Sequence, residues 1–406
     1  MEWKEVTLGE VSSKIGDGLH GTPKYDDEGS YYFINGNNLD CGKIIIKDDT
    51  KRVGIEEFVK NQKELNEQTI LVSINGTIGN VAKYNNEPCI LGKSACYINV
   101  IKEVDKEFIY YVLTSANFKR NITNEATGTT IKNVSLKQMR EYKFNIPCNI
   151  SDQRRIASIL SSLDRKIELN NKINADLEEM AQAIFKNWFV DFEPFKDGKF
   201  VDSELGMIPE GWKVGRADDF YQINIGKTPP RKEHKWFSTN PADKIWVSIA
   251  NMGNSGIFIS ESSEYLTKEA VDRHNIIMVP RNTILLSFKL TVGRVAIADK
   301  ELTTNEAIAR FILSDDKYME YLYLYLKNFD YNSLGSTSSI ATAVNSKTIK
   351  GMQMLQPSDN VIDAFHIQVN PIFEKIRSLT KENSRLSLLR DTLLPRLMSG
   401  EIEVPE

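Results

Sequence analysis

Three short stretches of the chain carry residue types that enzymes use. Residues 16–21 (GDGLHG) have the GxGxxG spacing of dinucleotide-binding loops, but Thr22-Pro23 stands where the helix of that motif would begin. Residues 233–235 (EHK) match the end of a nuclease ExK signature, without a convincing acidic partner upstream. Residues 239–242 (TNPA) lack the second proline and the aromatic ring with which adenine methyltransferases hold a flipped base. We therefore expect no catalytic residue in these stretches.

Metal binding and nucleophilic catalysis have equally weak support. The histidines are scattered, with no serine or cysteine nucleophile beside them: His20, His234, His274 and His366. The cysteines form no CxxC pair and have no histidine at zinc-ligand spacing: Cys41, Cys89, Cys96 and Cys148. We expect reduced, mostly buried thiols and no metal site.

Hydrogen bonding to phosphates and base edges is a better match to the loops. Phosphate anchoring uses Lys, Arg and backbone amides, and base reading uses amide, hydroxyl and cationic side chains. Such residues gather in the loops 14–25, 35–38, 128–135, 226–236, 251–255 and 335–345. The side chains that we expect to contact DNA are Lys14, His20, Thr22, Lys24, Asn35, Asn37, Asn38, Thr129, Thr130, Lys132, Asn133, Lys227, Thr228, Arg231, Lys232, Lys235, Asn251, Ser338, Thr342 and Asn345.

Residues 226–236 (GKTPPRKEHKW) include the most basic short stretch of the chain and are the strongest single DNA candidate. The alternative is a solvated charged loop. For Asn38 and Asn251 the alternative is an amide that only stabilises a turn. The aromatic run at residues 188–195 has helical spacing, which favours packing over a ligand site.

Composition sets the broad class. With 406 residues, 41% hydrophobic and 26% charged, the chain is long enough for two or three packed domains. It has 51 Lys and Arg against 55 Asp and Glu, a net charge of −4, so any DNA-binding surface must be local or aided by partners. No run of 18 apolar residues and no secretory signal pattern are present, and we expect a cytoplasmic protein without membrane contact.

The chain repeats itself. Residues 69–82 (TILVSINGTIGNVA) and 283–296 (TILLSFKLTVGRVA) are identical at eight of 14 positions, at an offset of 214. Trp3-Lys4 recurs as Trp212-Lys213, and FINGNNL at 33–39 is echoed by WVSIANM at 246–252. A duplication of a unit of about 200 residues follows. The short apolar runs and turn dipeptides of each unit predict an α+β domain with several strands and one or two helices, such as residues 107–119.

Each unit ends in a heptad segment, where apolar residues alternate in steps of four and three. We expect the first helix to be capped by Ser151-Asp152 and to end near Pro194 and Gly198. The seam positions are Ile156, Leu160, Leu163, Ile167, Asn174, Leu177 and Ile184 in the first segment and Phe365, Val369, Ile372, Ile376, Asn383, Leu386 and Leu393 in the second.

Two independent surface helices are one interpretation of these seams. We favour pairing with each other, because Asn174 and Asn383 occupy equivalent seam positions and a buried Asn can fix the register of a coiled coil. Residues 156–188 as a helix span about 48 Å. Two similar domains at the ends of such a rod would contact two separated patches of a duplex.

Four stretches resemble the specificity subunits of type I restriction-modification systems: Trp3 near the start, FKNWFVDFEPF at 185–195, ELGMIPEGWK at 204–213 and LLPRLMSGEIEV near the end. The resemblance covers the whole chain. It implies two target-recognition domains (1–150 and 199–357) separated by two long antiparallel coiled-coil helices (151–198, and 358–406 with the tail), related by an internal pseudo-two-fold repeat.

The resemblance also implies a non-catalytic subunit that binds double-stranded DNA and docks two modification (methyltransferase) subunits. S-adenosylmethionine would belong to those subunits, and ATP and Mg²⁺ to separate restriction subunits, so no cofactor is expected in this chain. Two alternatives stay open. A coiled-coil scaffold would not read DNA sequence, and an autonomous enzyme would need a cofactor motif that the sequence lacks.

Overall fold

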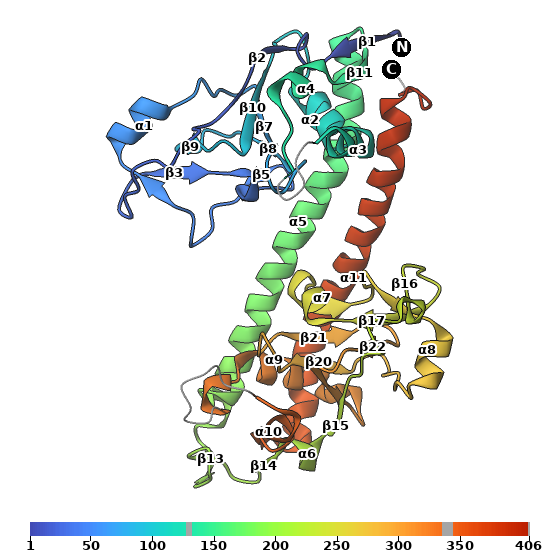
Figure 1. The fold of residues 1–406 in the computed structure, drawn as a ribbon. Coiled ribbons are helices and arrows are strands. Elements are labelled where there is room, and N and C mark those ends of the chain that lie inside the picture. Colours follow the sequence, from blue (N-terminus) through green and yellow to red (C-terminus); the bar gives the residue numbers. More distant parts are fainter. Residues whose placement is uncertain (127–131, 335–343, 405–406) are drawn as a thin grey trace. The chain divides into compact units, whose positions relative to one another are not determined.

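In a computed structural model of the chain, the described residues are 1–126, 132–334 and 344–404. They form two compact units that mix helices and strands (Figure 1). Unit 1 comprises Met1–Ile167 and Ser384–Glu406, and unit 2 comprises Glu168–Asn383. No helix in the described ranges is both long enough and apolar enough to cross a membrane.

Unit 1 is built on a four-stranded antiparallel sheet in the order β2-β10-β7-β8. Strands β7 and β10 are buried at every position, because their sequences TILVS and ACYINV are almost continuously apolar. The bounds are Ser12–Asp17 (β2), Thr69–Ser73 (β7), Val81–Lys83 (β8) and Ala95–Val100 (β10).

Smaller sheets and helices surround this sheet. The helix expected over residues 107–119 is two helices, because Ser115 ends the first and caps the second by accepting a hydrogen bond from Phe118 N. The other elements of unit 1 are β1 (Trp3–Thr7), β11 (Lys143–Pro147), β3 (Tyr31–Ile34), β6 (Arg52–Val53), β9 (Cys89–Leu91), β4 (Leu39–Asp40), β5 (Lys43–Ile44), η1 (Gly36–Asn38), α1 (Ile55–Asn61), α2 (Lys106–Thr114), α3 (Ala116–Glu125) and α4 (Leu136–Glu141).

Unit 2 repeats this plan with a five-stranded sheet in the order β15-β23-β20-β21-β18. The bounds are Gln222–Ile225 (β15), Ile308–Ile312 (β23), Ile284–Ser287 (β20), Val295–Ala298 (β21) and Phe258–Ile259 (β18). The other strands are β12 (Phe200–Val201), β13 (Ile208–Pro209), β14 (Lys213–Arg216), β24 (Gln353–Gln356), β16 (Phe237–Ser238), β17 (Lys244–Val247), β19 (Tyr265–Leu266) and β22 (Thr303–Thr304). The helices are α6 (Ala217–Phe220), η2 (Glu193–Phe195), η3 (His234–Trp236), α7 (Ile249–Asn254), α8 (Lys268–Arg273), η4 (Asp316–Tyr318), α9 (Met319–Asn328), η5 (Tyr331–Leu334) and α10 (Ser346–Lys350).

Strand registers confirm the duplication that the sequence predicts. Lys4 pairs with Ile146 in unit 1, and Lys213 pairs with Gln356 in unit 2, at offsets of 209 and 210. The paired segments TILVS and TILLS lie at the same place in the two sheets, next to β10 and β23 respectively. Each unit therefore contains one copy of the repeat.

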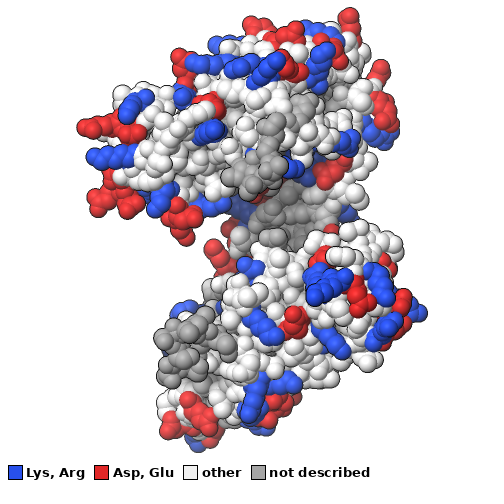
Figure 2. All heavy atoms as spheres, in the orientation of Figure 1, with Lys and Arg blue, Asp and Glu red and all other residues white. Residues whose placement is uncertain are grey.

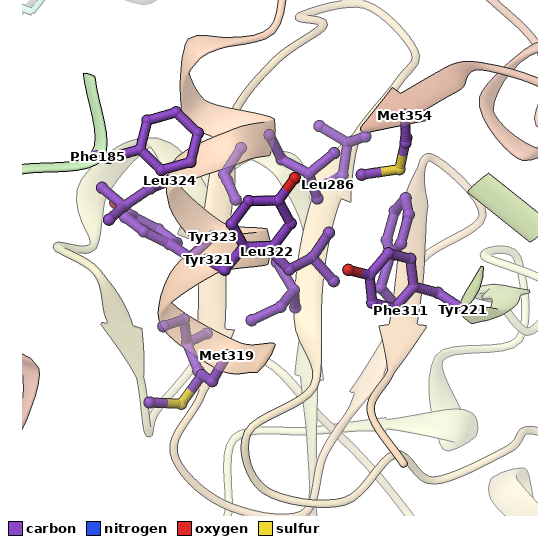
Figure 3. Close-up of a cluster of buried hydrophobic side chains, with 14 of the residues drawn as sticks. Phe185, Tyr221, Leu286, Phe311, Met319, Tyr321, Leu322, Tyr323, Leu324 and Met354 are labelled. Atoms are coloured by element: carbon purple, nitrogen blue, oxygen red, sulfur yellow. The ribbon is translucent and has the colours of Figure 1, made fainter. Parts of the chain in front are cut away.

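The core of unit 2 lies between its sheet, α9 and the long helices. Figure 3 shows Tyr321, Leu322, Tyr323 and Leu324 of α9 beside Leu286 of β20 and Phe311 of β23. All six side chains are fully buried. Rings of α9 also meet the long helices, as in the edge-to-face pair of Tyr323 with Phe373. The sheet of unit 2 and the helices thus share one core.

Two helices of 40 residues each close the repeats: α5 (Ile150–Phe189) and α11 (Asp359–Met398). The expected cap at Ser151-Asp152 is wrong, because Asn149 precedes the helix and its Oδ1 accepts a hydrogen bond from Ser151 N at 2.9 Å. The end of α5 falls before Pro194, as Phe192 turns into the left-handed region with φ of 53°. Two of the four cysteines, Cys41 and Cys148, are exposed and not buried as expected.

The two long helices pair antiparallel in unit 2. Asn170 Nδ2 donates to Asn383 Oδ1 at 2.9 Å, and the rings of Trp188 and Phe365 meet at 5.7 Å. In unit 1, Arg390 of α11 donates to Asp164 of α5 at 2.8 Å. All fourteen predicted seam residues are buried or half-buried.

The asparagine layer differs in detail from the expectation. Asn383 is bonded to Asn170 and Asn171, whereas Asn174 is not its partner. The reason is the antiparallel register of the two helices. The contacting pairs Asn170–Asn383 and Trp188–Phe365 both have residue numbers that add to 553, so Asn174 lies opposite Leu379. Asn174 Oδ1 is accordingly buried without a hydrogen-bond partner.

Candidate nucleic-acid interface

Loops converge at one end of the sheet in unit 1. Strands β2 and β7 end there and β8 and β10 begin there, because the four strands are antiparallel. Leu19 N donates to Leu91 O at 2.7 Å, Ile74 N to Ser94 O at 3.0 Å, and Val134 N to Ile74 O at 2.9 Å. We call this region, residues 18–24, 74–80, 92–94 and 132–134, the first loop end.

Unit 2 builds the same end from its own copy of the repeat. Lys227 N donates to Thr304 O at 2.8 Å, and Phe288 N donates to Ala307 O at 2.9 Å. These two bonds correspond to Leu19–Leu91 and Ile74–Ser94 of unit 1. We call this region, residues 226–236, 288–294 and 304–307, the second loop end.

Two of the three glycines of the GxGxxG spacing have a packing role near the first loop end, whereas a Cβ on Gly21 would meet nothing within 4 Å. A Cβ on Gly18 would lie 2.0 Å from Leu91 O, and a Cβ on Gly16 would lie 2.7 Å from the Tyr97 hydroxyl. Gly226 has the same role in unit 2, where a Cβ would lie 2.0 Å from Asn305 O. Close packing accounts for glycine at positions 16, 18 and 226.

Several predicted DNA contacts of the first half meet at the first loop end. His20, Thr22, Lys24 and Lys132 are exposed there. His20 Nε2 lies 2.7 Å from Asp17 Oδ2. These side chains can reach a ligand without rearrangement of the sheet.

Asn133 and Asn35 are more constrained than the exposed side chains. Asn133 Oδ1 accepts a hydrogen bond from Asn75 Nδ2 at 3.3 Å, and Asn35 Oδ1 accepts one from Ser94 Oγ at 2.9 Å. Both are half-buried. The Asn133 amide therefore connects two loops of the first loop end, and the Asn35 amide joins the adjacent turn to this region.

Lys14 lies away from the others, toward the opposite end of β2. Its Nζ is 2.9 Å from Glu64 Oε2, and its register partner is Asn99, near the end of β10. The hydrogen bond to Glu64 raises the pKa of Lys14 above its ordinary value. The structure thus does not bring Lys14 together with the remaining candidates.

Asn38 and Asn251 hold equivalent turns inside the two domains. Asn38 is 5% exposed, accepts from Asn35 N at 3.0 Å and donates to Ile45 O at 3.0 Å. Asn251 accepts from Ser248 N at 2.9 Å and donates to Ser263 Oγ at 3.3 Å. Because both amides are used internally at matching positions, the geometry favours the turn-stabilising role. Asn37, by contrast, is exposed.

The basic stretch at 227–235 is ordered by aromatic rings and acidic partners. Arg231 forms a two-point ion pair with Glu264, at 2.7 and 3.1 Å, and its guanidinium lies 4.4 Å from the Trp246 ring centre. Lys235 Nζ is 4.3 Å from the ring centre of Trp236. Such contacts fix the direction of the cations before any anion arrives.

The other polar residues of this stretch differ in whether their side chains already have a hydrogen-bond partner. Lys227 Nζ donates to His274 O at 2.5 Å, and Lys232 is exposed. Thr228 Oγ1 donates to Glu306. Burial alone would raise the pKa of Glu306, but the Thr228 hydrogen bond and nearby cations, Lys289 and Arg231 among them, lower it overall. A carboxylate therefore offsets part of the positive charge at the second loop end.

The remaining predicted contacts are a cap and four residues outside the described ranges. Asn345 is exposed, and its Oδ1 accepts from Thr348 N at 3.0 Å at the start of α10. Thr129, Thr130, Ser338 and Thr342 lie outside the described residues. Within the described residues, no group of three or more His, Cys, Asp or Glu could hold a metal ion.

Sequence reasoning missed two of the three segments of the second loop end, residues 304–307 and the β20–β21 hairpin at residues 288–294. Its tip carries Lys289 and Leu290, both exposed. The signal was present in the repeat, where Leu290 of the second copy aligns with Gly76 of the first.

Charge is mixed on the surface of both units. Figure 2 shows Lys and Arg interspersed with Asp and Glu on the visible face of each unit.

Comparison with known proteins agrees with this duplicated architecture. The family model described as type I restriction modification DNA specificity domain matches residues 1–179 and 209–359. The chain is 30% identical over 397 residues to the type I restriction enzyme MjaIX specificity subunit of Methanocaldococcus jannaschii, covering 95% of this chain and 87% of that protein. It is 29% identical over 360 residues to the HindI specificity subunit of Haemophilus influenzae, covering 73% and 77%.

The fold also resembles a solved structure. The crystal structure of a type I restriction-modification S subunit from M. genitalium superposes with a TM-score of 0.57 at 18% identity, covering 98% of this chain and 96% of that one. The likeness supports the same fold. Since the family model covers both copies of the repeat, the chain belongs to the family of type I restriction-modification specificity subunits.

Proposed function

We propose that this chain reads a bipartite double-stranded DNA site, with one half-site for each loop end, and that it carries no catalytic step itself. The observation that supports the proposal best is the pair of equivalent loop ends. Their framework bonds match in the two units, whereas the exposed loop residues differ, as at Gly76 and Leu290. A shared framework with divergent loops is suited to reading two different half-sites.

The second loop end offers the clearest division between phosphate and base contacts. Lys232 and Lys235 are exposed cations suited to phosphates, and Arg231 presents a planar fork that matches phosphate or guanine edges. In the complex, Arg231 would exchange Glu264 for the more negative DNA. The first loop end would rely on His20, Thr22 and Lys24 in the same way.

The long helices would dock two modification subunits and set the spacing between half-sites. Their outer faces carry exposed apolar side chains, including Leu169 and Met180 on α5 and Ile367 and Leu388 on α11. S-adenosylmethionine would be bound by the modification subunits, and ATP and Mg²⁺ by restriction subunits, in the cytoplasm of the host. This chain would recognise the target DNA sequence.

Methylome sequencing tests the proposal directly. A host that expresses the chain with its modification subunit is compared with a host that expresses the modification subunit alone. The expected result is a new adenine-methylated motif of two half-sites around an unread spacer, which disappears without the chain. Unchanged methylation, with the assembled complex verified, would favour a scaffold that does not read DNA.

A salt titration tests the basic stretch. We expect that replacing Arg231, Lys232 and Lys235 together by Gln lowers the affinity of the assembled complex for its site. The slope of log K against log salt should fall by about 1 for each phosphate that the variant no longer neutralises. The matched control removes three exposed lysines elsewhere in the same unit: Lys196, Lys199 and Lys213. Equal slopes for the two variants would exclude this stretch from the interface.

A further inference from the structure

Leu290 occupies an unusual position at the tip of the β20–β21 hairpin. Its side chain is 98% exposed, more than any other exposed large hydrophobic residue in the described ranges. Its φ is 61°, in the left-handed region that bulky side chains avoid. The backbone conformation costs free energy in the isolated chain, and the exposed side chain gains none from burial to offset it.

The first repeat provides an internal control for this position. Gly76 is the aligned residue, its φ is 74°, and a Cβ there would meet nothing within 4 Å. Glycine adopts this conformation without steric cost. The hairpin therefore folds without an apolar side chain at its tip, and folding does not explain Leu290.

Hydrogen bonds hold the tip in one conformation. Ser287 Oγ donates to Thr291 O at 2.6 Å and accepts from Arg294 N at 3.0 Å, and Gly293 N donates to Ser287 O at 3.0 Å. Ser73 makes the matching bond with Asn80 N at 2.8 Å in unit 1. Leu290 is thus presented on an ordered turn, which reduces the entropy lost on binding.

The surroundings of the tip favour an anionic partner. Phe288 N is bonded to Ala307 O, and the adjacent Glu306 is bonded to Thr228 of the basic stretch. The hairpin and the basic stretch therefore lie side by side, and the tip itself carries the exposed Lys289. Cations around an apolar tip fit a duplex, whose phosphates flank apolar thymine methyl groups in the major groove.

We propose that the hairpin tip enters the major groove of the half-site read by unit 2 and that Leu290 packs against the 5-methyl group of a thymine. This inference rests on the proposed function and specifies one contact of it. The major groove admits a two-stranded ribbon, and an apolar side chain discriminates thymine by its methyl group.

Two substitutions separate DNA contact from folding. Leu290→Gly and Leu290→Asn both suit a positive φ, so neither should lower the midpoint of thermal unfolding. Each should weaken binding of the assembled complex to its cognate duplex at least about ten-fold, the equivalent of removing one buried leucine side chain from the interface. Leu205→Asn, at another exposed leucine in unit 2, should leave the affinity unchanged.

Substitution of deoxyuridine for each thymine of the half-site identifies the methyl group. The native complex should lose about four-fold in affinity at one position, and the Leu290→Gly complex should not respond there. Native affinity in the Leu290 variants, or an equal response to deoxyuridine, would overturn the inference and leave the proposed function intact. Weakened association with the modification subunit at unchanged DNA affinity would also overturn it. A native complex that does not distinguish its site from a scrambled duplex would refute the proposed function itself.

Discussion

Replacing Asp299 should show most clearly how much more a buried ion pair contributes to stability than a surface ion pair does. The Asp299 side chain is 3% exposed and faces three cations: Arg377 Nε at 3.3 Å, Arg281 Nε at 3.4 Å and Lys381 Nζ at 3.2 Å. Arg377 and Lys381 belong to α11, so the contacts connect the sheet region of unit 2 to its long helix. Burial lowers the pKa of Arg377, whose side chain is 5% exposed.

We expect Asp299→Asn to lower the free energy of unfolding of unit 2 by about 2 to 3 kcal/mol. Removing one partner of a buried pair costs about 3 to 5 kcal/mol. The expected loss is smaller here because Arg377 keeps Asn282 and Glu374 as partners. Arg281 and Lys381 are half-exposed, and each adds about 1 kcal/mol or less.

Urea unfolding followed by tryptophan fluorescence is the assay. Four of the five tryptophans lie in unit 2: Trp188, Trp212, Trp236 and Trp246. The control is Asp191→Asn, which removes an exposed pair with Lys186 and should cost about 1 kcal/mol or less. An Asp299→Asn variant as stable as this control would refute the argument that burial makes the pair valuable.

Three further perturbations follow from the packing. Gly226→Ala should destabilise unit 2 by about 1 to 3 kcal/mol in urea unfolding, since a Cβ there meets backbone at 2.0 Å, whereas Gly256→Ala has open space and should not. Replacing Asn170 and Asn383 together by Leu should raise the unfolding midpoint, because Asn170 Oδ1 is buried without a partner; a lower midpoint would show that the polar layer stabilises the helix pair. Burial raises the pKa of Glu320 above its ordinary value of 4.5. The protonated carboxyl therefore contributes stability that is fully present below about pH 4.5, and this contribution is lost as the pH rises through the raised pKa. Relative to Glu320→Gln, the native chain should therefore become less stable over that pH range, and parallel stability curves would contradict the shift.

The sequence predicted the duplication, the long helices and some of the loops that gather at one end of each sheet, but not the segments 74–80 and 288–294. Repeat alignment was informative because equivalent residues make equivalent bonds, as Ser73 and Ser287 do with the backbone across their hairpins. Residue type was less informative. Lys14 matched the composition of a DNA contact, but its position along β2 places it toward the other end of the strand, beside Glu64.

Amide side chains illustrate the second limit of sequence reasoning. Asn37 and Asn38 are neighbours of the same type, yet one is exposed and the other is 5% exposed with its amide bonded to Asn35 N and Ile45 O. Only the local turn decides which of the two amides is free to contact a ligand. The asparagine partners on the long helices were mistaken for a similar reason, since repeat symmetry relates Asn174 to Asn383 whereas antiparallel packing pairs Asn383 with Asn170.

Each compact unit contains part of both long helices, with its boundaries between Ile167 and Glu168 and between Asn383 and Ser384. A recombination event that exchanged residues 1–150 alone would separate Tyr111 from its hydrogen-bond partner Asp164. Crossovers in the middle of the helices would carry such contacts along intact. Chimeric chains should therefore be joined within the helices, where each inherited half brings its own supporting residues.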